Sequence, residues 1–83
     1  MKTHNYFVFD YKSQSGKSRA QVVQIGTNLN IKSVIDDFSE IKNTKGEKAK
    51  LNIVMFANSQ KEANKIVNNW NQTYYNEGRH FDF

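Results

Sequence analysis

Two strand-like runs joined by a polar turn open the chain and decide its class of fold: YFVFDY at residues 6–11, SQSG at 13–16 and RAQVVQI at 19–25. Aromatic and β-branched residues favour strands, and a glycine-containing polar turn between two such runs predicts a β-hairpin. Gly26 then ends the second run. The first two elements are therefore predicted to be paired antiparallel strands.

A helix is predicted after the hairpin, with Asn30 as its N-cap. Leu29 precedes the cap and is placed to pack on Val34 as a hydrophobic staple. The helix is expected to end within residues 43–46, because Asn and Gly tolerate the left-handed conformation that terminates helices. Its apolar residues follow the 3.6-residue period of a helix: Ile31, Val34, Ile35, Phe38 and Ile41.

A third strand and a second helix complete the pattern. Residues 50–56 read KLNIVMF, which is typical of a strand, and Ser59 and Glu62 have the spacing of a capping box. Gly78 is the expected residue just past the end of this helix, and residues 79–83 alternate as a short edge strand would. The helix has a core stripe at Ala63, Ile66, Val67, Trp70 and Tyr74.

Together these elements predict one α+β domain over residues 1–83, in the order ββαβα. The expected architecture is a three-stranded mixed sheet with two helices on one face and a candidate short C-terminal edge strand. A chain of 83 residues buries only about 60–65% of its unfolded surface, so the core is small. The sequence has no cysteine, so packing or a partner subunit must stabilise it without disulfides.

The sequence suggests neither a membrane span nor a secretory leader. No apolar run approaches the roughly 18 residues that cross a bilayer, and residues 1–5 lead straight into the first strand without an apolar leader segment. The lack of cysteine agrees with a reducing compartment. We therefore expect a cytoplasmic protein.

Basic residues dominate the charge: Lys and Arg number 12 against 8 Asp and Glu, for a net charge of +4. The element order brings the hairpin turn, the connection before the third strand and the end of the second helix to one end of the domain. Such a basic end suits contacts to the phosphates of DNA or RNA. The alternative is a solvated loop end whose lysines keep the domain soluble. The candidate phosphate-binding residues are Lys12, Lys17, Arg19, Lys42, Lys45, Lys48, Lys50 and Arg79.

Two helices on one face leave the other face of the sheet without cover. Alternation along the first and third strands places four apolar residues on this outer face, as a candidate interface: Tyr6, Val8, Val54 and Phe56. Three coverings stay open: the C-terminal Phe81 and Phe83 folding back, a homodimer interface, or stacking of the aromatics on unpaired bases. The same face favours an alternative function, a small protein-interaction or inhibitory module of the mobile-element type that docks by a sheet face or edge.

No motif for phosphate-loop chemistry is present. Gly16, Lys17 and Ser18 match the end of a phosphate-binding P-loop, but Tyr11 stands where that motif requires glycine. A strand rather than a helix is also predicted to follow. The match is therefore rejected.

The titratable residues give no catalytic or metal-binding constellation. His4 and His80 fall at opposite ends of the predicted fold, so they are not expected to meet. Asp36 and Glu40 have the i, i+4 spacing that could hold a cation on a helix, yet Lys32 offers Asp36 a solvated ion pair. We expect a non-enzymatic binding module without cofactor or metal ion; a nuclease centred on His80 is the minor alternative.

Overall fold

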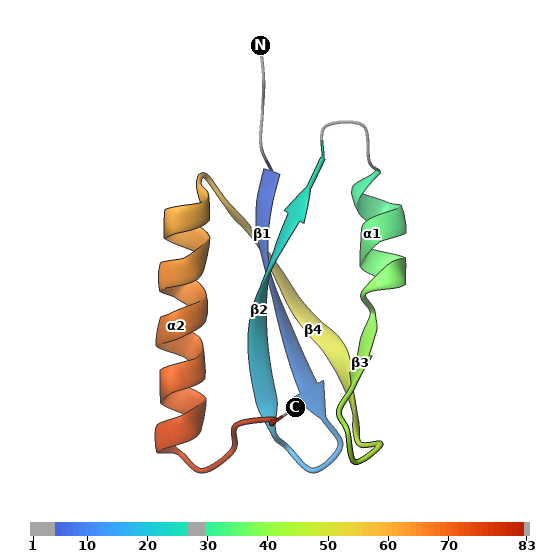
Figure 1. Ribbon diagram of the computed structural model, residues 1–83, viewed down its shortest axis with the longest axis vertical. Coiled ribbons are helices and arrows are strands. Elements are labelled where there is room, and N and C mark those ends of the chain that lie inside the picture. Colours follow the sequence, from blue (N-terminus) through green and yellow to red (C-terminus); the bar gives the residue numbers. More distant parts are fainter. Residues whose placement is uncertain (1–4, 27–29, 83) are drawn as a thin grey trace.

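The structure, a computed structural model, describes residues 5–26 and 30–82. Its elements are, in chain order, β1 (Asn5–Ser13), β2 (Ser18–Ile25), α1 (Ile31–Asp37), β3 (Glu40–Lys42), β4 (Lys48–Ala57) and α2 (Gln60–Asn76). The strands form one antiparallel sheet in the order β2-β1-β4-β3. The two helices lie on opposite sides of this curled sheet (Figure 1).

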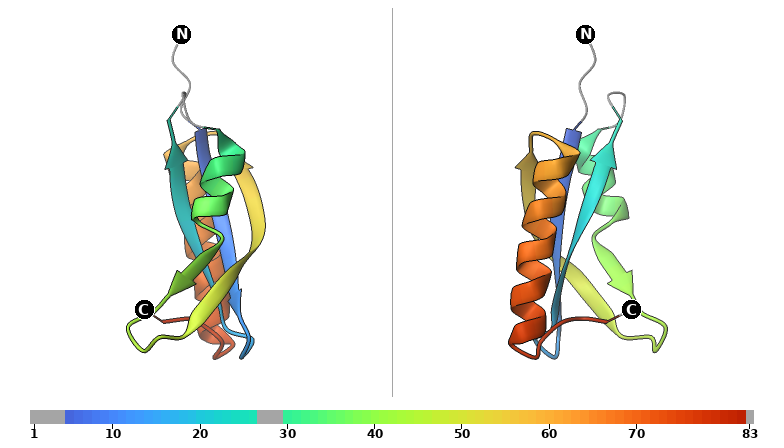
Figure 2. Two further views of the ribbon diagram at one scale, coloured as in Figure 1. Left: turned by 90° about the vertical axis from the view of Figure 1, so that its right-hand side faces the viewer. Right: turned by 60° about the vertical axis from the view of Figure 1, so that its left-hand side comes forward.

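The α+β class is confirmed, but three details of the predicted fold are wrong. The sheet has four strands rather than three, and every neighbouring pair is antiparallel rather than mixed. The helices flank the sheet instead of sharing one face, as both views in Figure 2 show. Each face of the sheet therefore has a helix of its own.

The additional strand, β3, lies where the sequence predicted the last turn of the first helix. α1 ends at Asp37, and the next residues pair with the start of β4. Asn43 explains this, because its side-chain oxygen accepts from the backbone N–H of Lys45 at 3.0 Å and of Glu47 at 2.9 Å. Asn43 thus builds a hairpin turn that Gly46 completes with a φ of 85°. The prediction that the first helix ends within residues 43–46 is therefore wrong, because these residues form a turn between two strands.

The N-cap of α1 and both ends of α2 follow the sequence prediction. Asn30 accepts from the N–H of Lys32 at 2.9 Å, whereas Leu29 lies outside the described residues. Ser59 accepts from the N–H of Glu62 at 3.1 Å. Gly78 has a φ of 71° just beyond α2, where the N–H groups of residues 78 and 79 donate to the carbonyls of residues 75 and 74. This is the bonding pattern of a Schellman motif.

The α2 side of the sheet has a small core. Val8 and Ala20 of the sheet are buried together with Ala57 and with Ala63 of α2. Partly buried residues close this cluster: Tyr6, Val22, Ile66, Val67 and Trp70. Because alanines occupy the contact, α2 can approach β1 and β2 closely.

The other side has a larger core, which α1 and the C-terminal tail cover. Phe9, Tyr11 and Val34 of α1 are buried there with Phe81, whose exposed fraction is 0%. The tail thus folds back, one of the three coverings considered above, but it lies on the α1 side of the sheet, next to the β3–β4 turn. The candidate C-terminal edge strand reduces to a single bridge between Ser18 and His80. Phe83 lies outside the described residues.

A β-bulge in β4 overturns the predicted outer face. Asp10 faces Ile53 while Tyr11 faces Leu51, so Asn52 is an extra residue in β4. Beyond the bulge, Ile53 and Met55 point to the α2 side. Val54 and Phe56 point to the α1 side. The expected interface set is therefore divided: Tyr6 and Val8 pack under α2, whereas Val54 and Phe56 lie on the opposite face.

Candidate functional site

The basic end of the domain lies where the two hairpin turns and the end of α2 come together (Figure 1). The hydroxyl of Ser15, in the β1–β2 turn, donates to Oε2 of Glu47, in the β3–β4 turn, at 2.9 Å. This hydrogen bond links the two turns directly. Six exposed lysines lie on the strands and turns of this end: Lys12, Lys17, Lys42, Lys45, Lys48 and Lys50.

Four of these lysines share one face of the sheet, which we call the lysine face. Lys12 is directly opposite Lys50, and Lys42 is directly opposite Lys48. All four point to the α2 side. Lys12 shares this side with Asp10, because residues two apart on a strand point to the same face. The residues directly opposite on the neighbouring strands β4 and β3 point to that face as well. The lysine face also contains one carboxylate, because Glu40 on β3 is directly opposite Lys50. Figure 2 (right) shows this part of β3 and β4 extending beyond the cover of α2.

A shallow hollow of about 800 Å³ lies at this end, open to solvent. Three lysines of the lysine face contribute to its lining together with Glu40 and Glu47. Glu47 is engaged, because its two carboxylate oxygens accept from Ser15 and from Asn43. The lysines that line the hollow are therefore exposed to solvent, whereas the carboxylate oxygens of Glu47 are already bonded within the turns.

The two arginines of the predicted set lie on different sides of the sheet. Arg79 pairs through Nε with Glu77 at 2.6 Å, and its guanidinium lies 4.7 Å from the centre of the Tyr74 ring. Arg19 is half-buried on the α1 side, opposite Tyr11. Nη1 of Arg79 lies 3.5 Å from Oγ of Ser18, which is directly opposite Lys12, so Arg79 lies beside the lysine face, whereas Arg19 lies on the other side of the sheet.

Asp10 is a buried carboxylate at the contact between β1 and α2. Its exposed fraction is 3%, and its Oδ1 accepts from the hydroxyl of Tyr74 at 2.8 Å. Burial raises the pKa of Asp10 above its ordinary value, while the bond from Tyr74 and the charge of Arg79 oppose that rise. Burial and the same hydrogen bond raise the pKa of Tyr74 to about 12. This pair ties the end of α2 to the sheet.

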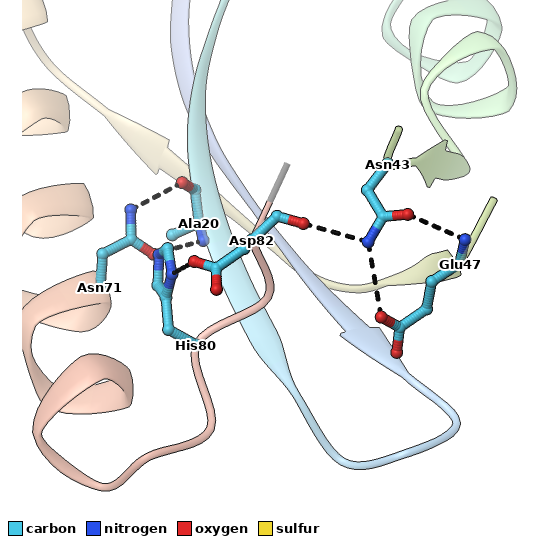
Figure 3. Close-up of polar contacts among 6 residues, drawn as sticks. All are labelled: Ala20, Asn43, Glu47, Asn71, His80 and Asp82. Carbon is cyan, nitrogen blue, oxygen red and sulfur yellow. Dashed lines mark hydrogen bonds and ion pairs between the residues drawn. The ribbon is translucent and has the colours of Figure 1, made fainter. Parts of the chain in front are cut away.

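His80 and the tail make polar contacts that are visible in Figure 3. Nδ1 of His80 lies 3.0 Å from Oδ1 of Asp82, and the bond from His80 lowers the pKa of that exposed carboxyl. The carbonyl of Asp82 accepts from the side chain of Asn43 at 3.1 Å, joining the tail to the β3–β4 turn. Within residues 5–26 and 30–82, no three His, Asp or Glu side chains gather to hold a metal ion. His4 lies outside this range, so its relation to His80 stays a prediction.

The two margins of the sheet differ in a way that the sequence did not reveal. On β2, the N–H and C=O of Ser18 bond to the tail at 2.8 Å each. Those of Ala20 bond to the side chain of Asn71 at 2.8 and 3.0 Å (Figure 3). The first part of the outer margin of β2, at Ser18 and Ala20, is therefore covered by its own chain.

On β4, the outer margin is covered only in its first half. β3 pairs with residues 48–50, and the N–H of Leu51 donates to the carbonyl of Ser39 at 2.8 Å. No described strand lies outside residues 52–56, which we call the β4 edge (Figure 2, left). Four consecutive apolar side chains of this edge have exposed fractions of 36–57%: Ile53, Val54, Met55 and Phe56. The uninterrupted apolar run in residues 53–57 was the only sequence signal for this site.

Comparisons with known proteins gave no family and no relative. The chain matched no protein-family model, and neither the curated proteins nor the solved structures gave a significant match. Among the described residues, no helix has both the length and the apolar character needed to cross a bilayer.

Proposed function

We propose that this chain is a nucleic-acid-binding module that contacts phosphates through its lysine face. The observation that supports this proposal is the register of the sheet, which sets Lys12 opposite Lys50 and Lys42 opposite Lys48. Like charges directly opposite one another destabilise a sheet, by amounts on the order of 0.2–1 kcal/mol for each pair. A phosphate bound among the four lysines would relieve that repulsion.

The spacing of the lysines suits a polyanion rather than a single small ion. Neighbouring strands are about 4.8 Å apart, and residues two apart on a strand are separated by roughly 7 Å. Neighbouring lysine backbones of this face therefore lie within about one Debye length of each other at physiological salt, so neighbouring charges act together. Their long side chains leave the exact phosphate positions free, which favours binding without strong sequence preference.

The proposal describes a binding module rather than an enzyme, and it needs neither cofactor nor metal ion. DNA and RNA both remain candidate partners, because a lysine–phosphate contact does not distinguish them. A cytoplasmic location belongs to the proposal and is supported by the absence of cysteine.

The test is the salt dependence of binding to labelled single-stranded DNA, duplex DNA and RNA, followed by fluorescence anisotropy. Four phosphate contacts give a slope of about −3.6 in log affinity against log salt, so affinity should fall by about two orders of magnitude between 50 and 200 mM salt. Binding that ignores salt, or no binding at 50 mM salt to any of the three probes, would refute the proposal.

A pair of matched variants separates the lysine face from net charge. Lys48→Gln with Lys50→Gln removes half of the face, which should lower the slope by about 2. Lys61→Gln with Lys65→Gln removes the same charge from exposed positions near the start of α2, at the opposite end of the domain (Figure 1). The second variant should keep the slope of the unmodified chain, and an equal loss in both variants would contradict a localised site.

A second candidate function, a protein-interaction or inhibitory module, is favoured by the β4 edge. An exposed edge with unpaired backbone groups is a template for a strand supplied by another chain. Hydrogen exchange distinguishes the two functions: strand addition should protect the amides of residues 52–56, whereas phosphate binding at the lysine face should leave them unchanged.

A further inference from the structure

We infer that the β4 edge pairs with the β4 edge of a second copy of this chain, joining two four-stranded sheets into one. The first argument is the contrast between the two margins of the sheet. On the margin of β2, Ser18 and Ala20 bond to the tail and to Asn71, and the only exposed side chain among residues 21–25 is the polar Gln24. Residues 52–56 of β4 have no strand outside them in the described chain and expose four apolar side chains. Natural edges that stay unpaired are commonly protected by lysine, proline, a β-bulge or a covering segment. Residues 51–58 contain neither lysine nor proline, and the bulge at Asn52 lies at one end of the edge, outside the apolar run of residues 53–56.

The length of the open edge fits an antiparallel copy of itself. On one side it is bounded by Leu51, which bonds to Ser39, and on the other by Ala57, which is buried before the chain turns into α2. Two-fold pairing centred on Val54 uses residues 52–56 of each copy. In this register the paired segment ends at Asn52, next to Leu51 and Ser39, and each β3, which pairs with residues 48–50, lies beyond that end.

The side chains are complementary in the same register. A two-fold axis at Val54 places Ile53 opposite Met55 of the second copy, and both residues point to the α2 side. Val54 then meets its own equivalent on the α1 side, where Phe56 and Phe38 are also exposed, at 57% and 43%. Apolar surface is thus matched with apolar surface on both faces of the joined sheet.

The charges favour a second copy over a charged partner. No Asp, Glu, Lys or Arg lies between Asn52 and Ser59, so the edge offers no counter-charge to an acidic or basic strand. The lysine face lies at the first half of β4, where β3 pairs with it, and antiparallel pairing of the second halves keeps the two lysine faces apart. The net charge of +4 on each copy therefore does not concentrate at the interface. The inference does not depend on the phosphate-binding proposal.

Molar mass in solution tests the inference directly, by light scattering and sedimentation equilibrium over a concentration series from about 5 to 500 μM. The unmodified chain should approach twice its mass of 9.7 kDa as concentration rises. Val54→Lys should weaken the dimer at least 10-fold, because two ammonium groups would then face each other at the two-fold axis. Ile31→Lys is a matched control: Ile31 is also β-branched and also 37% exposed, but it lies on α1.

Each outcome decides the inference. A dimer that survives Ile31→Lys and dissociates with Val54→Lys supports it. A chain that stays monomeric at 500 μM overturns it and leaves the edge to a different protein, and equal dissociation in both variants overturns it too. If Val54→Lys fails to fold, Met55→Lys on the other face replaces it. Hydrogen exchange of the unmodified chain gives an independent readout, because residues 52–56 should become protected as concentration rises; protection confined to other residues would exclude this edge.

Discussion

Replacing Phe81 by alanine should cost this domain a large part of its stability, although the residue stands in the C-terminal tail. Phe81 has an exposed fraction of 0% and packs in the cluster that contains Phe9 and Tyr11. Its N–H donates to the carbonyl of Ser18 at 2.8 Å, so the tail is held along β2 while the ring enters the core. Truncation would leave a cavity below α1 that the remaining tail cannot fill.

The magnitude follows from the burial. Truncating a fully buried phenylalanine costs about 3–5 kcal/mol, whereas a domain of this size has a free energy of unfolding of roughly 4–12 kcal/mol. With a urea dependence of about 1.5 kcal/mol per molar, the unfolding midpoint should fall by roughly 2–3 M. Urea unfolding followed by circular dichroism and by the fluorescence of Trp70 measures this shift.

Two further variants make this prediction decisive. Tyr75→Ala removes an aromatic side chain that is 71% exposed and should change the free energy of unfolding by less than about 0.5 kcal/mol. If Phe81→Ala is unfolded even without urea, Phe81→Leu should remain folded. Its free energy of unfolding should lie between those of Phe81→Ala and the unmodified chain. The reasoning is wrong if Phe81→Ala shifts the midpoint by no more than Tyr75→Ala does.

Three other substitutions probe the contacts that fix the helices and turns. Asp10→Asn keeps an acceptor for Tyr74 and removes a buried charge. Because burial raises the folded-state pKa of Asp10, the unmodified chain loses stability as pH rises from 3.8 through that pKa. Asp10→Asn has no such titration, so its stability should rise relative to that of the unmodified chain over this pH range. Parallel pH profiles of the two urea midpoints would contradict this. Asn71→Ala should lower the free energy of unfolding by about 2 kcal/mol in urea, because it removes two hydrogen bonds to the margin of β2. Asn68→Ala, at an exposed site on the same helix, should change it by less than about 0.5 kcal/mol. Equal costs would refute the role of the Asn71 amide. Gly46→Ala should cost about 1 kcal/mol in the same assay through its φ of 85° alone, since the added methyl would come no closer than 3.9 Å to the side chain of Lys42; an unchanged midpoint would exclude strain at this turn.

Local signals predicted the elements that local chemistry determines. The β1–β2 hairpin, the capping of α1 by Asn30 and the ends of α2 at Ser59 and Gly78 all depend on residues within a few positions of each other. Each uses a side chain or backbone conformation that only a few residue types supply. For these elements the sequence was sufficient.

Longer-range features were beyond the same reasoning. Ile41 has the helical spacing, yet it pairs with Ala49, because Asn43 closes a turn that draws residues 40–42 onto β4. Asn52 carries no sign that it is a bulge, but it decides which face receives Val54 and Phe56. Strict alternation therefore assigned the two sides of β4 incorrectly. The grouping of lysines at one end depended only on element order, which is why that geometric expectation survived the error, while its role in binding stays a prediction.

β4 relates the two proposals, because each uses a different half of the same strand. Its first half has Lys48 and Lys50 on the α2 side and is covered at its margin by β3, so it can bind a ligand on its face but not a strand at its edge. Its second half has no charge and no covering strand, so it can receive a strand. In a dimer centred on Val54, opposed residues share a face, and the two lysine faces therefore lie on the same side of the joined sheet. The two Lys50 residues would then be separated by eight residues, or about 26 Å, along the strand direction. A polyanion that spans this distance would contact both faces at once and gain affinity through effective concentration, without any new contact within either copy.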